Sequence, residues 1–130
     1  MSAADTKLVW PSARLRLVDI LVKMWLLKAF FRAIVQHCDD DIKFQKEVLV
    51  QMEKEVKQHN ASGEDYAYLK DRVLVNEKHK QLYGTQTRYN KETHQHLPFP
   101  IQDALNVDAR RKAVGLSSLK DYLKEIDAVY

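Results

Sequence analysis

The sequence predicts an all-α fold, a single domain of about five helices with one long ordered loop. Glycine and proline, which favour tight turns, number only three each in 130 residues, and this disfavours a β-sandwich or a barrel. Apolar residues instead recur at helical spacing over long stretches. The content of 45% hydrophobic and 30% charged residues is typical of a globular chain. We therefore expect a flexible tail over residues 1–9 and a single helical domain over residues 10–130.

The first expected helix begins after Trp10-Pro11-Ser12, with Ser12 as its N-cap, and runs to Cys38. Its charged and apolar residues fall on opposite sides, and His37 falls on the apolar side. Charged residues also interrupt the apolar segment 15–35 too often for an uncharged membrane span of about 20 residues. We expect a core helix and no membrane insertion, with a basic amphipathic surface helix as the alternative.

Two further helices follow the first. One of the aspartates in Asp39–Asp41 is expected to cap the second helix, which ends near His59. Ser62, with Asp65 three residues later, forms a capping pattern that opens the third helix. On this helix Asp71 projects among apolar and aromatic neighbours, so we expect it to be partly buried. A buried carboxylate must find hydrogen-bond donors or lose its charge.

The rest of the chain is predicted to form the long loop and two more helices. Residues 78–105 show weak periodicity and hold most of the turn-forming residues, so they are predicted to be the ordered loop. Asn106 is expected to cap a short helix that runs through Val114 and stops at Gly115. Ser118 then opens a last helix. Its expected apolar face consists of Leu119, Tyr122, Leu123, Ile126 and Val129.

Charge and cysteine content argue against several classes of function. The net charge of +3 is spread along the chain without a basic patch, so no nucleic-acid partner is expected. The single cysteine, Cys38, permits neither an internal disulfide nor a zinc site built from cysteine pairs, which fits a reducing, cytoplasmic location. His94 and His96 could start a metal site, but without an obvious third ligand a solvated loop is favoured and no metal site is predicted. The sequence identifies no cofactor and no oligomeric state.

Five strings of the sequence carry a family resemblance. They are VWPS, VQHCDDDIKFQ, YLKDRV, QLYGTQ and VDARRKAVGLSSLKDYL, which span residues 9–123. Together they resemble an uncharacterised, mostly bacterial family of small helical proteins whose pattern includes Q-H-A-D, Y-L-x-D-R-V and Y-G-T-Q. The chain departs from that pattern at Val9 and Cys38. The resemblance implies positions and no activity, and these positions are Trp10, Pro11, Gln36, His37, Asp39, Phe44, Gln45, Asp71, Arg72, residues 83–86, Arg111, Gly115 and Leu116.

One candidate site combines His37, Asp71 and the loop at residues 81–86. In a catalytic interpretation His37 acts as general acid or base near neutral pH, and Asp71 orients it or stabilises its charge. The loop would then hold a substrate with its backbone N–H groups and polar side chains. The side chains expected to bind are those of Gln81, Tyr83, Thr85 and Gln86. In a structural interpretation the same polar groups are buried ties that hold the loop to the core.

Gly84 and two arginines complete the candidate site. A glycine in this polar string predicts a positive φ or close packing of its Cα against a helix. Arg72 and Arg111 could clamp an anionic ligand, since guanidinium matches carboxylate and phosphate, or could form structural ion pairs. The sequence thus predicts a small-molecule-binding protein or enzyme, with a small-molecule ligand as its partner. The alternative is a non-catalytic helical module for protein interaction.

Overall fold

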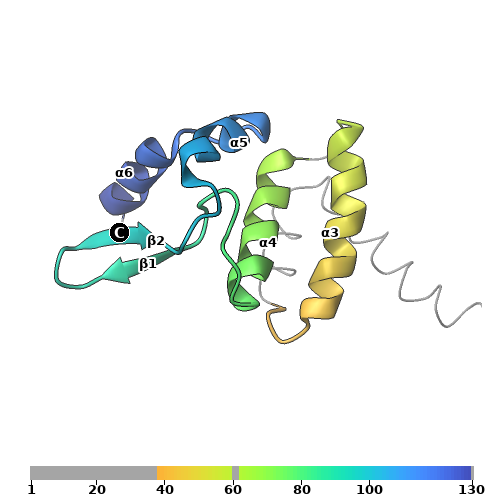
Figure 1. The fold of residues 1–130 in the computed structure, drawn as a ribbon, viewed down its shortest axis with the longest axis horizontal. Helices are drawn as coiled ribbons and strands as arrows, with labels where there is room; N and C mark the ends of the chain where they lie inside the picture. Colours follow the sequence, from red (N-terminus) through yellow and green to blue (C-terminus); the bar gives the residue numbers. More distant parts are fainter. Residues whose placement is uncertain (1–37, 60–61, 130) are drawn as a thin grey trace, which may run out of the picture. The chain divides into compact units, whose positions relative to one another are not determined.

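The computed structural model describes residues 38–59 and 62–129 (Figure 1). The chain divides into two compact units, Met1–Ala61 and Ser62–Tyr130. The predicted tail over residues 1–9 and nearly all of the predicted first helix, with His37, lie outside the described residues. The single domain expected over residues 10–130 stays a prediction.

The described part of the first unit is built around helix α3 (Ile42–Lys57). Asp41 caps this helix, because its Oδ1 accepts a hydrogen bond from the Phe44 N–H at 3.0 Å. The expected aspartate cap and the second helix are therefore confirmed. The buried residues of α3 follow helical spacing, and they are Gln45, Val48, Leu49 and Met52.

The second unit contains three α-helices and a short 3-10 helix: α4 (Gly63–Asn76), η1 (Ala104–Asn106), α5 (Val107–Ala113) and α6 (Leu119–Val129). Two predicted caps are confirmed. Ser62 Oγ accepts from the Asp65 N–H at 3.4 Å, and Ser118 Oγ accepts from the Asp121 N–H at 3.2 Å. Asn106 stands at the N-cap of α5, but its side chain donates to Asp103 Oδ2 at 2.8 Å and makes no capping bond.

The predicted all-α fold is wrong, because a β-hairpin lies inside the segment expected to be a loop. Strands β1 (Thr87–Asn90) and β2 (Gln95–Pro98) pair antiparallel, with Thr87 opposite Pro98 and Asn90 opposite Gln95. The described residues thus hold four α-helices and a two-stranded sheet (Figure 1). The second unit combines α and β structure.

The turn of the hairpin explains why the sequence pattern did not reveal it. Residues 91–94 join the strands without a glycine. Asn90 Oδ1 accepts from the N–H groups of Glu92 and Thr93, which fixes the first half of the turn. His94 closes the turn with a φ of 56°, a conformation usually given to glycine. Because histidine is not a typical turn residue at this position, the sequence pattern did not predict a hairpin.

Buried apolar side chains and one close helix approach hold the second unit together. Its buried apolar residues are Ala67, Leu69, Val73 and Val107. A Cβ added to Gly63 would lie 2.9 Å from the backbone oxygen of Val114, so the start of α4 lies against the end of α5. Val129, expected on the apolar face of α6, is 73% exposed and does not join the core. No helix among residues 38–59 and 62–129 is long and apolar enough to cross a membrane.

Candidate functional site

The loop at residues 81–86 is fixed to α4 by Asp71. This aspartate has no exposed surface, which agrees with its expected inward orientation. Its Oδ1 accepts from the N–H groups of Leu82 at 2.8 Å and Tyr83 at 3.0 Å. Its Oδ2 accepts from Tyr83 N–H at 3.2 Å and from the backbone N–H and hydroxyl of Thr85 at 3.0 and 2.8 Å. One carboxylate therefore holds three residues of the loop.

Two opposing effects act on the ionisation of Asp71. Burial raises the pKa of the Asp71 carboxyl above its ordinary value, because water is removed from the charged form. The hydrogen bonds from Thr85, Leu82 and Tyr83 lower the pKa and offset part of this effect. All of these partners donate to the carboxyl oxygens, and this is the arrangement that a carboxylate needs when it is withdrawn from water.

Gln81 closes the other end of the loop with its side-chain amide. The Oε1 atom accepts from the Gln86 N–H at 2.9 Å, and the Nε2 atom donates to the carbonyls of Gln86 at 3.0 Å and Phe99 at 2.9 Å. The Phe99 N–H donates to the same Gln86 carbonyl at 3.1 Å. The amide thus replaces a peptide group at the base of the hairpin, where it links the two chain segments that lead into β1 and out of β2.

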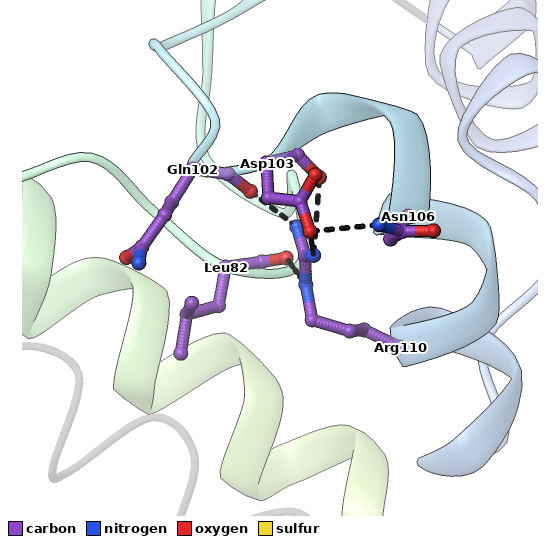
Figure 2. Close-up of polar contacts among 5 residues, drawn as sticks. All are labelled: Leu82, Gln102, Asp103, Asn106 and Arg110. Atoms are coloured by element: carbon purple, nitrogen blue, oxygen red, sulfur yellow. Dashed lines mark hydrogen bonds and ion pairs between the residues drawn. The ribbon is translucent and has the colours of Figure 1, made fainter.

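The carbonyl groups of the loop are bound from α5 and α6. Arg110 donates to the carbonyl of Leu82 at 2.8 Å and to the carbonyls of Gln102 and Asp103, and Figure 2 shows its guanidinium among these oxygens. Arg111, only 1% exposed, donates to the carbonyl of Tyr83 at 2.7 Å. Asp71 thus binds N–H groups of the loop, whereas the two arginines bind its carbonyls.

A second set of contacts surrounds the guanidinium of Arg111. Its Nε atom donates to the Ser117 carbonyl at 2.6 Å. Its Cζ atom lies 4.8 Å from the ring centroid of Tyr122, a cation–π geometry. The Tyr122 hydroxyl in turn donates to the Thr85 carbonyl at 2.8 Å. Burial lowers the pKa of Arg111, because it removes water from the charged guanidinium. The carbonyl groups that accept its hydrogen bonds take the place of that water.

Gly84 has the conformation that the sequence predicted. Its φ is +70°. A Cβ added at this position would lie 2.9 Å from Leu119 Cδ1 and 3.1 Å from Ile101 Cδ1. The glycine is therefore required both by the left-handed backbone and by close packing against side chains of the second unit. These two requirements explain why a chain with only three glycines has one of them in this polar segment.

The structure brings together most of the predicted site residues. Asp71 and Arg111 both bind backbone groups of the loop, and the side chains of Gln81, Thr85 and Gln86 form further hydrogen bonds there. Gln86 Nε2 donates to Thr85 Oγ1 at 3.1 Å. Tyr83 contributes its backbone N–H and carbonyl. Arg72 is half-buried on α4.

Several participants were not predicted, and the catalytic pair remains untested. Arg110 was not among the predicted site residues, and Tyr122 was expected only on the apolar face of the last helix. His37 lies outside the described residues, so the predicted catalytic roles of His37 and Asp71 stay predictions.

His94 and His96, the candidate metal ligands of the sequence, have other neighbours. His94 Nδ1 lies 3.0 Å from the Tyr89 hydroxyl, and His96 Nδ1 lies 2.8 Å from Asp127 Oδ1. The backbone N–H of His96 also donates to Asp127 Oδ1, at 2.7 Å. In the described part of the chain, no three His, Cys, Asp or Glu side chains are grouped so that they could hold a metal ion. His96 therefore links β2 to α6.

Comparison with known proteins gives one match. A sequence model of the family of unknown function DUF6624 matches residues 17–130. The chain belongs to this family. The DUF6624 match covers the whole of α3 and the whole second unit, and it includes the loop at residues 81–86. It confirms the expected membership of a family without assigned activity, whereas bacterial origin and the motif pattern are not part of the finding. Neither the curated proteins nor the solved structures gave a match.

Proposed function

We propose that this DUF6624 protein is a non-catalytic interaction module, in which Asp71, Gln81 and Arg111 are buried structural ties. The observation that carries this proposal is the closed network around Asp71. Its carboxyl group has no exposed surface, and both oxygens accept hydrogen bonds from the loop. A general acid or base must reach a substrate proton within hydrogen-bond distance, directly or through one water. Asp71 could do so only if the loop moved away.

The same contacts weigh against substrate binding by the loop. The N–H groups of Leu82, Tyr83 and Thr85 donate to Asp71, and the N–H of Gln86 donates to Gln81. These are the groups that the catalytic interpretation assigned to a substrate. The small-molecule or enzyme interpretation of this site is therefore the weaker candidate.

The hairpin offers a surface for a protein partner. Tyr89 lies opposite His96, whose N–H points away from β1 to Asp127. Two directly opposed residues of an antiparallel pair point their N–H and C=O groups either both toward the partner strand or both away from it. Because the His96 N–H points away from β1, the N–H and C=O of Tyr89 point away from β2. Backbone direction repeats every two residues along a strand, so the N–H and C=O of Thr87 also point away from β2.

The two edges of the hairpin differ in what they offer. On the outer edge of β2, Asp127 binds the His96 N–H, and Pro98 has no N–H. On the outer edge of β1, no described residue binds the backbone groups of Thr87 and Tyr89. An exposed edge of this kind pairs with an extended strand of another protein. The proposed module therefore binds its partner by adding a strand beside β1.

Asp71→Asn tests the structural role of the buried aspartate. The substitution keeps the shape but places an NH₂ group against N–H donors, so we expect it to cost about 1–3 kcal/mol of unfolding free energy. Thermal unfolding and limited proteolysis at residues 78–86 measure the effect. Glu64→Gln is the control, because it removes a carboxylate from an exposed position on the same helix. An Asp71→Asn protein that unfolds and resists proteolysis like the parent would refute the structural role.

A second experiment tests binding at the β1 edge. Extended peptides selected from a random display library against the full chain should protect the Thr87 and Tyr89 amides from hydrogen exchange. Tyr89→Pro removes the outward N–H and should abolish binding, whereas Arg88→Ala, whose backbone faces β2, should retain it. Peptides that protect only other amides, or that bind Tyr89→Pro unchanged, would count against this surface.

A further inference from the structure

A hollow on the second unit lies between the end of α4 and the segment that follows β2, and Asp71 is not among its lining residues. It has a volume of about 650 Å³, within the range of small-molecule sites. Apolar side chains and cationic groups line it together. Its lining residues are Val75, Asn76, Lys78, His79, Lys80, Phe99 and Pro100. Among residues 38–59 and 62–129, no acidic side chain lines the hollow.

The α4 wall of the hollow is fixed by the way the helix ends. The His79 N–H donates to the Leu74 carbonyl at 2.8 Å, and the Lys78 N–H donates to the Val75 carbonyl at 3.0 Å. This pair of bonds is a Schellman motif, in which the residue with positive φ is usually glycine. Here that residue is Lys78, with a φ of 65°. The chain thus keeps a lysine side chain where glycine would be the less strained choice.

The opposite wall is fixed by Gln81. Its side chain binds the Phe99 carbonyl at 2.9 Å, and its backbone N–H binds the Pro100 carbonyl at 3.0 Å. The Gln102 N–H donates to the Gln81 carbonyl at 2.8 Å. Both walls of the hollow are therefore held by hydrogen bonds before any ligand arrives, which reduces the entropic cost of binding.

We propose that this hollow binds a small organic acid, whose carboxylate contacts Lys78 and Lys80 and whose apolar body contacts Val75, Phe99 and Pro100. The composition of the lining carries the argument. Two lysines without a neighbouring carboxylate in the lining complement an anion, and the apolar side chains complement a hydrocarbon or aromatic group. The site goes beyond the proposed interaction module and does not depend on it.

Binding of 2-naphthoate to the full chain tests the site. Amide chemical-shift changes should be confined to residues 75–80, Phe99 and Ile101. The neutral isostere 2-naphthamide should bind about tenfold more weakly because it lacks the charge, and acetate should bind more weakly because it lacks the apolar body. No shift changes at millimolar 2-naphthoate, shift changes elsewhere, or equal affinity for the amide would each overturn the proposal.

The variant Lys78→Gly separates binding from stability. Glycine suits the positive φ at this position, so the melting temperature should stay the same or rise. The affinity for 2-naphthoate should nevertheless fall about tenfold, because the carboxylate loses a charged partner. Lys120→Ala removes an exposed lysine that is not part of the lining and should leave the affinity unchanged. An equal loss of affinity in both variants, or no loss in Lys78→Gly, would overturn the proposed site. Neither result affects the test of the proposed interaction module by Asp71→Asn.

Discussion

Asp71 and Asp127 both receive backbone N–H groups from another segment of the second unit, but in opposite surroundings. Asp71 is fully buried, whereas the Asp127 side chain is 29% exposed. At Asp71, burial raises the pKa despite several donors. At Asp127, hydrogen bonds from the backbone and side chain of His96 lower the pKa. Burial thus outweighs the hydrogen bonds at Asp71, whereas the hydrogen bonds outweigh burial at Asp127.

The two shifts have opposite consequences for stability. The folded state binds the Asp71 proton more tightly than the unfolded chain does, so ionisation of Asp71 weakens folding as the pH rises above the ordinary value of 3.8. The folded state binds the Asp127 proton less tightly. Asp127 therefore contributes stability above its ordinary value of 3.8, and this stability is lost as the pH falls through the lowered pKa.

The adjacent arginines Arg110 and Arg111 extend the comparison and give the largest expected effect. Both donate to backbone carbonyls, but Arg111 is 1% exposed and the Arg110 side chain is 24% exposed. We expect Arg111→Met to cost about 3 kcal/mol, because the carbonyls of Tyr83 and Ser117 lose charged donors at a buried position.

Arg110→Met should cost about 1 kcal/mol, although Arg110 binds more carbonyls, because water can reach them after the substitution. Urea unfolding of both variants measures the difference. Equal losses in the two variants would show that burial does not control the strength of these ties.

Gly84 and Gly115 allow the same kind of comparison for the backbone. Their φ values are +70° and +85°, so alanine at either position should cost about 1 kcal/mol for the left-handed conformation. At Gly84 the added methyl group would also lie 2.9 Å from Leu119 Cδ1, while at Gly115 the nearest atom is 3.8 Å away. We expect a total of about 2 kcal/mol for Gly84→Ala, since a well-packed site resists an extra methyl group. Thermal unfolding that ranks Gly115→Ala as the more damaging change would contradict this account.

The sequence predicted those features that depend on short-range chemistry. The caps at Asp41, Ser62 and Ser118, the burial of Asp71 and the positive φ of Gly84 all follow from local spacing or from a single residue type. Each of these residue types has few alternative structural roles at its position, so a single sequence was enough to predict the feature.

The sequence did not predict features in which an ordinary residue takes an unusual place. His94 and Lys78 have positive φ where glycine is expected, and at His94 this left the hairpin turn unmarked. The end of α4 was nevertheless placed close to Asn76, because the loop was predicted to begin at residue 78. Arg111 was expected either to clamp an anionic ligand or to form a structural ion pair, but it binds carbonyls of the chain itself. A guanidinium group matches both kinds of oxygen, and only the fold decides which one it meets.

Asp127→Asn gives the smallest expected effect and tests whether the negative charge of Asp127 stabilises the fold. The asparagine keeps an oxygen for the His96 N–H but removes the negative charge, so the variant should melt slightly below the parent at neutral pH. The gap should close as the pH falls below 3.8, because the parent then loses the same charge by protonation. Melting curves across this range measure it, with Glu125→Gln as an exposed control on α6. A gap that stays constant with pH would mean that the charge of Asp127 does not stabilise the contact between β2 and α6.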